Sequence, residues 1–260
     1  MRRYLPSALI FLLALIVWEL LAAGSRAAFL LGVPSAVWRV LWRATIDGTL
    51  PSHAMTTGLE ALSGFLIGAG AGTVTGFLLW YSPGVARISK PYVFVLSIVP
   101  SFSFAPIIII WFGIGFGMKV AMAALATFVV ALSQAYEGCR NIEPQMFQLL
   151  RIMGASRRQV LRIVVLPASL AWVFNSLRLN VGVALLGAFI GEFISSDRGV
   201  GYFMIRAGSL YDVPGVWAGA IYLLLLAVIL NLGVAVLERQ KLQIARAVSV
   251  SRSRGNFSSL

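Results

Sequence analysis

The sequence contains few of the side chains that usually catalyse reactions or bind metals. It has one histidine, His53, and one cysteine, Cys139, so it cannot form an intrachain disulfide or a metal site with thiolate spacing. Phosphate-binding loops, H-E-x-x-H zinc motifs and G-x-S-x-G nucleophile motifs are also absent. We therefore predict that the chain is not an enzyme, has no catalytic or metal-binding residues and binds no cofactor itself. We assign no function to His53, a lone histidine at the edge of an apolar segment.

The polar residues best placed to recognise a partner lie in the segment 136–167, which we name the docking loop. It carries five arginines and two glutamates, and it also contains two short runs with the apolar spacing of a helix. Pro144 can begin the first run, and Gly154 ends it. Ser156 opens the S-x-x-Q pattern of a capping box, which predicts a second helix that ends or bends at Pro167. The docking loop is therefore predicted to be a helix, a tight turn and a helix that dock on a partner protein.

Other polar side chains lie inside apolar segments, where ionisable groups are costly to bury. The segment 92–112 is interrupted by Pro100 and Pro106, and broken helices mark binding regions in many transporters. A kink absorbed by packing is the open alternative for this segment, and the charged candidates could equally belong to structural ion pairs. The candidates for lining a solute pathway are Ser101, Ser103, Arg178 and Glu192.

The composition is that of a membrane protein. Hydrophobic residues make up 59% of the chain and charged residues 12%, whereas globular domains have about 25% charged residues. One membrane-crossing helix needs about 20 apolar residues, so 260 residues hold about six spans but no additional soluble enzyme domain. The predicted fold class is an all-α polytopic membrane protein. The six expected spans are residues 5–23, 54–80, 92–112, 119–135, 168–195 and 214–237.

The charge distribution predicts the orientation of these spans. Fourteen Lys and Arg residues fall on the side of the docking loop and six on the opposite side. Under the positive-inside rule, the docking loop and both termini are cytoplasmic, in a multi-pass protein of the bacterial inner membrane. No basic soluble face remains, so the net charge of +12 does not indicate nucleic-acid binding. The first apolar run also resembles a signal peptide; its length and Glu19 favour an anchor, and cleavage stays open.

The second predicted span carries glycine at every fourth position. Residues with this spacing share one face of a helix, and small residues allow two helices in a membrane to approach closely. We predict a helix-packing face there, with a substrate-facing role as the alternative. The four residues of this glycine ladder are Gly64, Gly68, Gly72 and Gly76.

The docking loop resembles the EAA signature of ABC-importer permeases, which consists of E-A-A, three residues, G, nine residues and I-x-L-P. Gly154, Leu166 and Pro167 match that pattern, whereas Gln148 and two leucines replace the opening E-A-A. Further matches over about residues 30 to 240 resemble the nitrate/sulfonate/taurine branch of these permeases. They include Pro34-Ser35, the glycine ladder, the run 111–115 after Pro100 and Pro106, Leu177-Arg178, Gly191-Glu192 and Gly199-Val200-Gly201.

The resemblance implies a type I ABC importer permease fold and a role as the membrane subunit of an importer. The expected solute is small and anionic or sulfonate-like, and transport would proceed by alternating access. ATP and Mg²⁺ would be bound by separate cytoplasmic ATPase subunits. The other expected partners are an extracytoplasmic substrate-binding protein, membrane lipid and a second permease copy, with a different permease chain as the open alternative. The residues expected to couple to the ATPase are Gln148, Arg151, Gly154, Ala155, Ser156, Arg157, Leu166 and Pro167.

This interpretation divides the chain into three regions. Residues 1–53 hold the first anchor and an outer interfacial segment, residues 54–237 form the permease core, and residues 238–260 form a basic cytoplasmic tail. Two other functions are the alternatives. A self-contained secondary transporter would be expected to show an internal repeat and buried ionisable relays. A membrane protein with an assembly role would explain the glycine ladder but not the basic helix pair.

Overall fold

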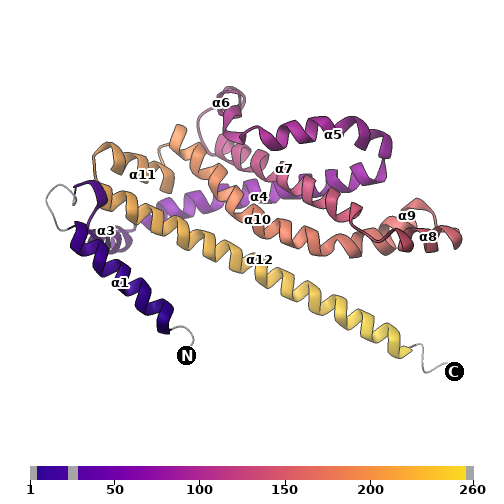
Figure 1. Cartoon of the computed structure of the whole chain (residues 1–260). Coiled ribbons are helices and arrows are strands. Elements are labelled where there is room, and N and C mark those ends of the chain that lie inside the picture. The colour runs from indigo at the N-terminus through magenta and orange to yellow at the C-terminus, as the bar shows by residue number, and fades with distance from the viewer. Residues whose placement is uncertain (1–4, 23–28, 256–260) are drawn as a thin grey trace.

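The structure is a computed structural model that describes residues 5–22 and 29–255. Every regular element within these ranges is a helix, which confirms the all-α prediction (Figure 1). The elements are α1 (Leu5–Ala22), α3 (Pro34–Ile46), α4 (Thr49–Tyr81), α5 (Pro83–Ile98), the 3₁₀ turn η1 (Ser101–Phe104), α6 (Ala105–Phe112), α7 (Phe116–Arg140), α8 (Pro144–Ile152), α9 (Arg157–Val160), the π-helical turn η2 (Leu161–Val165), α10 (Leu166–Ile194), α11 (Val200–Ser209) and α12 (Val213–Gly255).

Four helical stretches in the described residues are long and apolar enough to cross a membrane. They are Thr49–Tyr81, Phe116–Arg140, Arg157–Ile194 and Val213–Val236, and the bent pair of α5 with η1 and α6 makes a fifth. The first predicted span corresponds to α1, whose described apolar stretch Leu12–Ala22 is shorter than the others.

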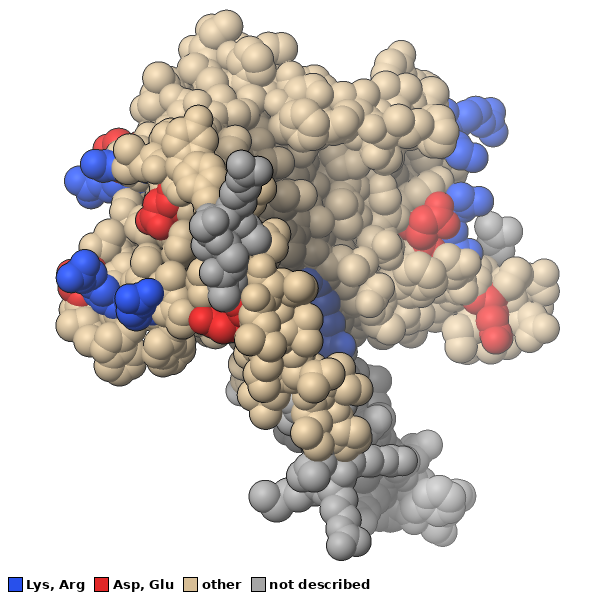
Figure 2. Space-filling model, turned by 60° about the vertical axis from the view of Figure 1, so that its left-hand side comes forward, with Lys and Arg blue, Asp and Glu red and all other residues tan. Residues whose placement is uncertain are grey.

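Charged side chains lie mainly toward two sides of the molecule, and the surface between them is largely uncharged (Figure 2). This distribution suits a protein whose middle faces lipid.

The helices α4, α7 and α10 pack together at the centre of the bundle. The structure places the glycine ladder on the face of α4 that contacts α7. A Cβ atom added at Gly76 would lie 2.7 Å from the Cβ atom of Ala135, and one added at Gly64, Gly68 or Gly72 would also overlap α7. The two backbones are therefore closer than any larger side chain would allow.

The third predicted span is broken, as the two prolines suggested. Helix α5 ends at Ile98, η1 begins at Ser101, and the two parts meet at 96°. Pro100 stands in the break, whereas Pro106 lies in the first turn of α6, where a missing N–H leaves no helical bond unmade. Helix α5 begins at Pro83, so the helix starts before the predicted third span, 92–112.

Three other boundaries differ from the prediction. Helix α7 continues to Arg140, so the first residues of the docking loop extend the fourth span. The segment between the predicted fifth and sixth spans contains a further helix, α11. Helix α12 runs past the predicted end of the sixth span to Gly255. Helices α3 and α11 lie at one end of the bundle and α8 and α9 at the opposite end, while α1 and α12 lie along one side (Figure 1).

Candidate functional site

The docking loop has the predicted local structure of helix, tight turn and helix. Gly154 adopts φ +74°, a left-handed conformation that glycine reaches without the steric cost of a side chain. Ser156 and Gln159 form the capping box: the Ser156 amide donates to Gln159 Oε1 at 2.7 Å, and the Gln159 amide donates to Ser156 Oγ at 3.4 Å. These contacts fix where α8 ends and α9 begins.

The inner face of α8 is anchored to the membrane bundle by apolar packing. Phe147 and Leu150 pack against a buried cluster of Cys139, Ile142, Val160 and Val165. The Phe147 ring also stacks on the Trp80 ring, with their centroids 6.1 Å apart. Because Trp80 belongs to the last turn of α4, the docking helices are fixed to the same helix that carries the glycine ladder.

Arg157 makes a second contact with the end of α4. Its guanidinium lies 6.0 Å from the centroid of the Trp80 ring and 5.4 Å from that of the Tyr81 ring. A terminal nitrogen of this guanidinium also donates to the Trp80 carbonyl oxygen at 3.4 Å. Arginine over an aromatic face gives about 0.5–1 kcal/mol at an exposed site. Sequence reasoning selected Arg157 but missed Trp80.

The outer face of α8 exposes large apolar side chains. Met146 is 50% exposed, Leu149 61%, Ile152 85% and Met153 72%. Met146, Leu149 and Ile152 recur at every third residue of α8, and Met153 follows in the turn after it; we name these four exposed side chains the α8 patch. Gln148 and Arg158 are also exposed beside it. Among the described residues, nothing covers this patch.

The helix that begins at α9 does not end at Pro167, contrary to one of the two predicted outcomes. The chain passes through the π-helical turn η2 into α10, and the Leu166 amide donates to the Leu161 carbonyl five residues back. Pro167 lies in the first turn of α10, where its missing N–H is tolerated. The π-helical turn absorbs the irregularity that a proline imposes on a continuous helix.

The structure does not bring the four predicted pathway residues together. Ser101 lines a cavity of about 240 Å³ at the break between α5 and η1, which is also lined by Ser97 and Pro100. Ser103 and Arg178 are exposed and are not among the residues that line this cavity. Glu192 is 1% exposed and lies near the C-terminal end of α10. Their role in transport stays a prediction.

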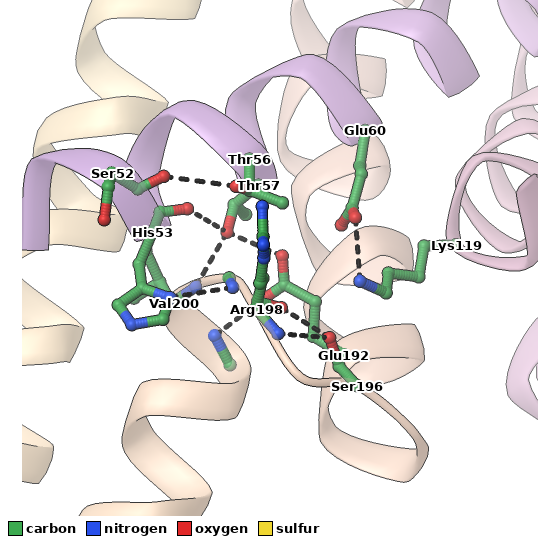
Figure 3. A network of polar contacts seen from close by, with 12 residues as sticks. Ser52, His53, Thr56, Thr57, Glu60, Lys119, Glu192, Ser196, Arg198 and Val200 are labelled. Atoms are coloured by element: carbon green, nitrogen blue, oxygen red, sulfur yellow. Dashed lines mark hydrogen bonds and ion pairs between the residues drawn. The ribbon is translucent and has the colours of Figure 1, made fainter. Parts of the chain in front are cut away.

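Glu192 belongs to a group of buried and half-buried polar residues that sequence reasoning largely missed (Figure 3). We name this group the outer polar cluster, after the side of the membrane on which the charge distribution of the sequence predicts it; its members are His53, Thr57, Glu60, Lys119 and Glu192. The Lys119 ammonium lies 2.9 Å from Glu60 Oε1, and both residues are almost fully buried. The Thr57 hydroxyl lies 2.6 Å from Glu192 Oε1. An acidic residue inside a glycine-rich apolar span was the available signal for Glu60.

The outer polar cluster accepts hydrogen bonds from the backbone amides at the start of α11. The first amides of a helix have no partner within the helix. Here the amide of Gly199 donates to His53 Nδ1 at 3.0 Å, that of Val200 to Thr57 Oγ1 at 2.8 Å and that of Gly201 to Glu192 Oε2 at 2.6 Å. His53, which was assigned no function from the sequence, thus contacts the residue that precedes α11 through an unprotonated nitrogen. The cluster fastens α11 to α4 and α10.

Comparison with known proteins decides the family. A protein-family model described as "Binding-protein-dependent transport system inner membrane component" matches residues 64–243, which is more than half of the chain. The chain belongs to this family. It is therefore an ABC-importer permease of the inner membrane, as the resemblance of the docking loop to the EAA signature implied.

Individual relatives agree with this assignment. A Haemophilus influenzae protein named as an ABC transporter permease is 31% identical over 85% of this permease and 90% of the relative. A Bacillus subtilis protein named as an aliphatic sulfonates transport permease is 28% identical over 87% of this permease and 83% of the relative. The fold resembles a chain of the MetNI methionine ABC transporter in an inward-facing conformation, with a TM-score of 0.58 and 17% identity over 73% of this permease and 92% of that chain.

Proposed function

We propose that this permease imports a small organic anion of the sulfonate class and that separate ATPase subunits, docked on the α8 patch, drive the transport. The exposed apolar face of α8 is the observation that carries this proposal. Phe147 and Leu150 fix the same helix to the bundle, whereas the side chains of the α8 patch stay exposed and are free to contact a partner protein. An amphipathic helix of this kind fits a groove on a soluble protein.

The chemistry of the proposed contact differs from an ion pair. Gln148 stands where the family signature has an acidic residue, so this position offers a hydrogen-bonding amide instead of a charge. Apolar contact through Leu149, Ile152 and Met153 supplies the affinity, and the arginines around it favour an acidic rim on the ATPase. Arg151, Gly154 and Ala155 complete the proposed coupling segment together with Ser156, Arg157, Leu166 and Pro167.

The proposed transport cycle uses the attachment of the docking helices to two spans. ATP and Mg²⁺ bind in the partner ATPases, whose closure moves α8 and α9. Trp80 passes this movement to α4, and the continuous helix through η2 passes it to α10. Two permease subunits, in the simplest case two copies of this chain, then change from an outward-facing to an inward-facing cavity.

The proposed orientation puts the docking helices and both termini in the cytoplasm. The excess of Lys and Arg on the docking side supports this orientation. A substrate-binding protein outside the membrane delivers the solute to the end that carries α3 and α11, and lipid covers the apolar belt. The name of the Bacillus subtilis relative supports an aliphatic sulfonate as the solute.

Co-purification of the ATPase tests this function. Ile152→Glu places a charge in the centre of the α8 patch, and we expect the tagged variant to lose the ATPase that accompanies the wild-type chain. Leu210→Glu is the matched control, because Leu210 is 71% exposed beyond the end of α11, at the opposite end of the molecule. We expect that control to retain the ATPase. Undiminished recovery with Ile152→Glu would contradict docking on this patch.

A further inference from the structure

The outer polar cluster contains an imbalance of buried charge. Glu60, Lys119 and Glu192 are 0%, 2% and 1% exposed, respectively. With both carboxyl groups ionised, the three side chains would carry a net charge of −1 where little water can screen it. An unpaired charge is among the most costly groups to bury in a protein interior.

The hydrogen bonds of Glu60 show where the imbalance lies. Its Oε1 atom accepts a hydrogen bond from the Lys119 ammonium. Its Oε2 atom is fully buried and has no hydrogen-bond partner among the described residues. A buried carboxylate oxygen without any donor is rare in folded proteins, so this atom needs a hydrogen from a neighbouring group.

Within the cluster, the group that could share such a hydrogen is the carboxyl of Glu192. Thr57, one turn before Glu60 on α4, lies 2.6 Å from Glu192 Oε1, so the two carboxyl groups belong to the same buried cluster between α4 and α10 (Figure 3). Glu192 is held there by Thr57 and by the Gly201 amide. A Cβ atom at Gly199 or Gly201 would collide with the Glu192 side chain, so the backbone also encloses it.

We propose that Glu60 and Glu192 share one proton and that this proton holds the outer end of the permease together. The proton gives Glu60 Oε2 its missing partner and makes the three buried side chains neutral as a set. The site is a proton-binding carboxyl pair, and it goes beyond the importer function because it concerns the end of the molecule opposite the docking helices.

The shared proton has a structural consequence for α11. Glu192 accepts from the Gly201 amide at a position inside the buried cluster that also holds Glu60, and two ionised carboxylates in one buried cluster repel each other. The other polar and charged groups near the pair are Lys119 on α7, Thr57 and His53 on α4, and Asp197 and Arg198 in the outer loop. Among the described residues, the one ion pair of these two glutamates joins Glu60 to Lys119.

Infrared spectroscopy of the full-length protein tests the proposal directly. At neutral pH, in a detergent without ester groups, we expect a C=O stretching band of a protonated carboxylic acid that shifts in D₂O. Glu60→Gln and Glu192→Gln should each abolish it, because the remaining glutamate then pairs with Lys119 as a carboxylate. Glu137→Gln removes an exposed carboxylate and should leave the band unchanged. The proposal is overturned if wild type lacks the band or if either cluster variant retains it.

Thermal unfolding of the same variants gives an independent measurement. Each single variant keeps the cluster neutral, so we expect unfolding temperatures near that of wild type. The double variant Glu60→Gln/Glu192→Gln leaves Lys119 as a buried cation without a carboxylate, and we expect a fall much larger than the sum of the two single changes. An additive double variant would contradict the shared pair. Neither measurement requires the ATPase, so failure here is separate from failure of the importer proposal.

Discussion

At the scale of single residues, Arg157 connects the docking helices to the membrane bundle. It opens α9, and its guanidinium lies over the Trp80 and Tyr81 rings while it donates to the Trp80 carbonyl oxygen. This contact is formed by a side chain that is itself exposed, so its effect on the stability of the fold is small. Its proposed importance lies in the transmission of movement from α9 to α4.

Substitution of Arg157 tests that transmission. Arg157→Ala removes a contact of about 1 kcal/mol, so we expect uptake to fall roughly fivefold while the ATPase still co-purifies. Arg157→Lys should give an intermediate result, because lysine keeps the charge but not the planar group that stacks on the rings. Arg158→Ala is the control for charge alone. The role of the contact is wrong if Arg158→Ala reduces coupled uptake as strongly as Arg157→Ala does.

At the scale of elements, the close approach of α4 to α7 depends on the absence of side chains at the glycine ladder. Gly68 lies against Ala124 and Thr127, and any Cβ atom there would overlap the α7 backbone. Gly70 is on the same helix but has no atom within 4 Å of the position where its Cβ would lie. The two glycines therefore separate the effect of packing from that of helix propensity.

The stability of these two variants can be compared directly. Gly68→Val should destabilise the protein by about 1–3 kcal/mol or more, since overpacking forces the helices apart. Gly70→Ala should be neutral or stabilising by up to about 1 kcal/mol, because alanine favours the helix over glycine. Thermal unfolding of the purified proteins in the same detergent measures both. Equal unfolding temperatures for the two variants would contradict a packing role for the ladder.

The docking loop could be predicted as an element because its signals are local. Gly154, Ser156 and Gln159 lie within six residues, and each acts on the backbone beside it. The continuation of the helix through Pro167 was not predictable in the same way, since a π-helical turn leaves no mark in the sequence. The outer polar cluster was missed because Glu60 and Lys119 are 59 positions apart and Thr57 and Glu192 are 135 apart. Only the packing of α4, α7 and α10 brings them together.

At the scale of the whole molecule, the permease has different chemistry at its two ends. One end exposes the apolar α8 patch among arginines, and the opposite end has a buried ionisable cluster that fastens α11. Both ends are attached to α4, which runs from the outer polar cluster at Thr57 to the docking helices at Trp80. A movement of the docking helices can therefore reach the outer end through one continuous helix.

The energy source of transport is the most direct test of this account. We would measure uptake of a labelled aliphatic sulfonate by cells that express the permease with its neighbouring transport proteins. The account predicts that uptake stops when ATP is depleted and persists when an ionophore collapses the ion gradients. Uptake that survives ATP depletion but stops with the ionophore would contradict it and would establish a secondary transporter instead.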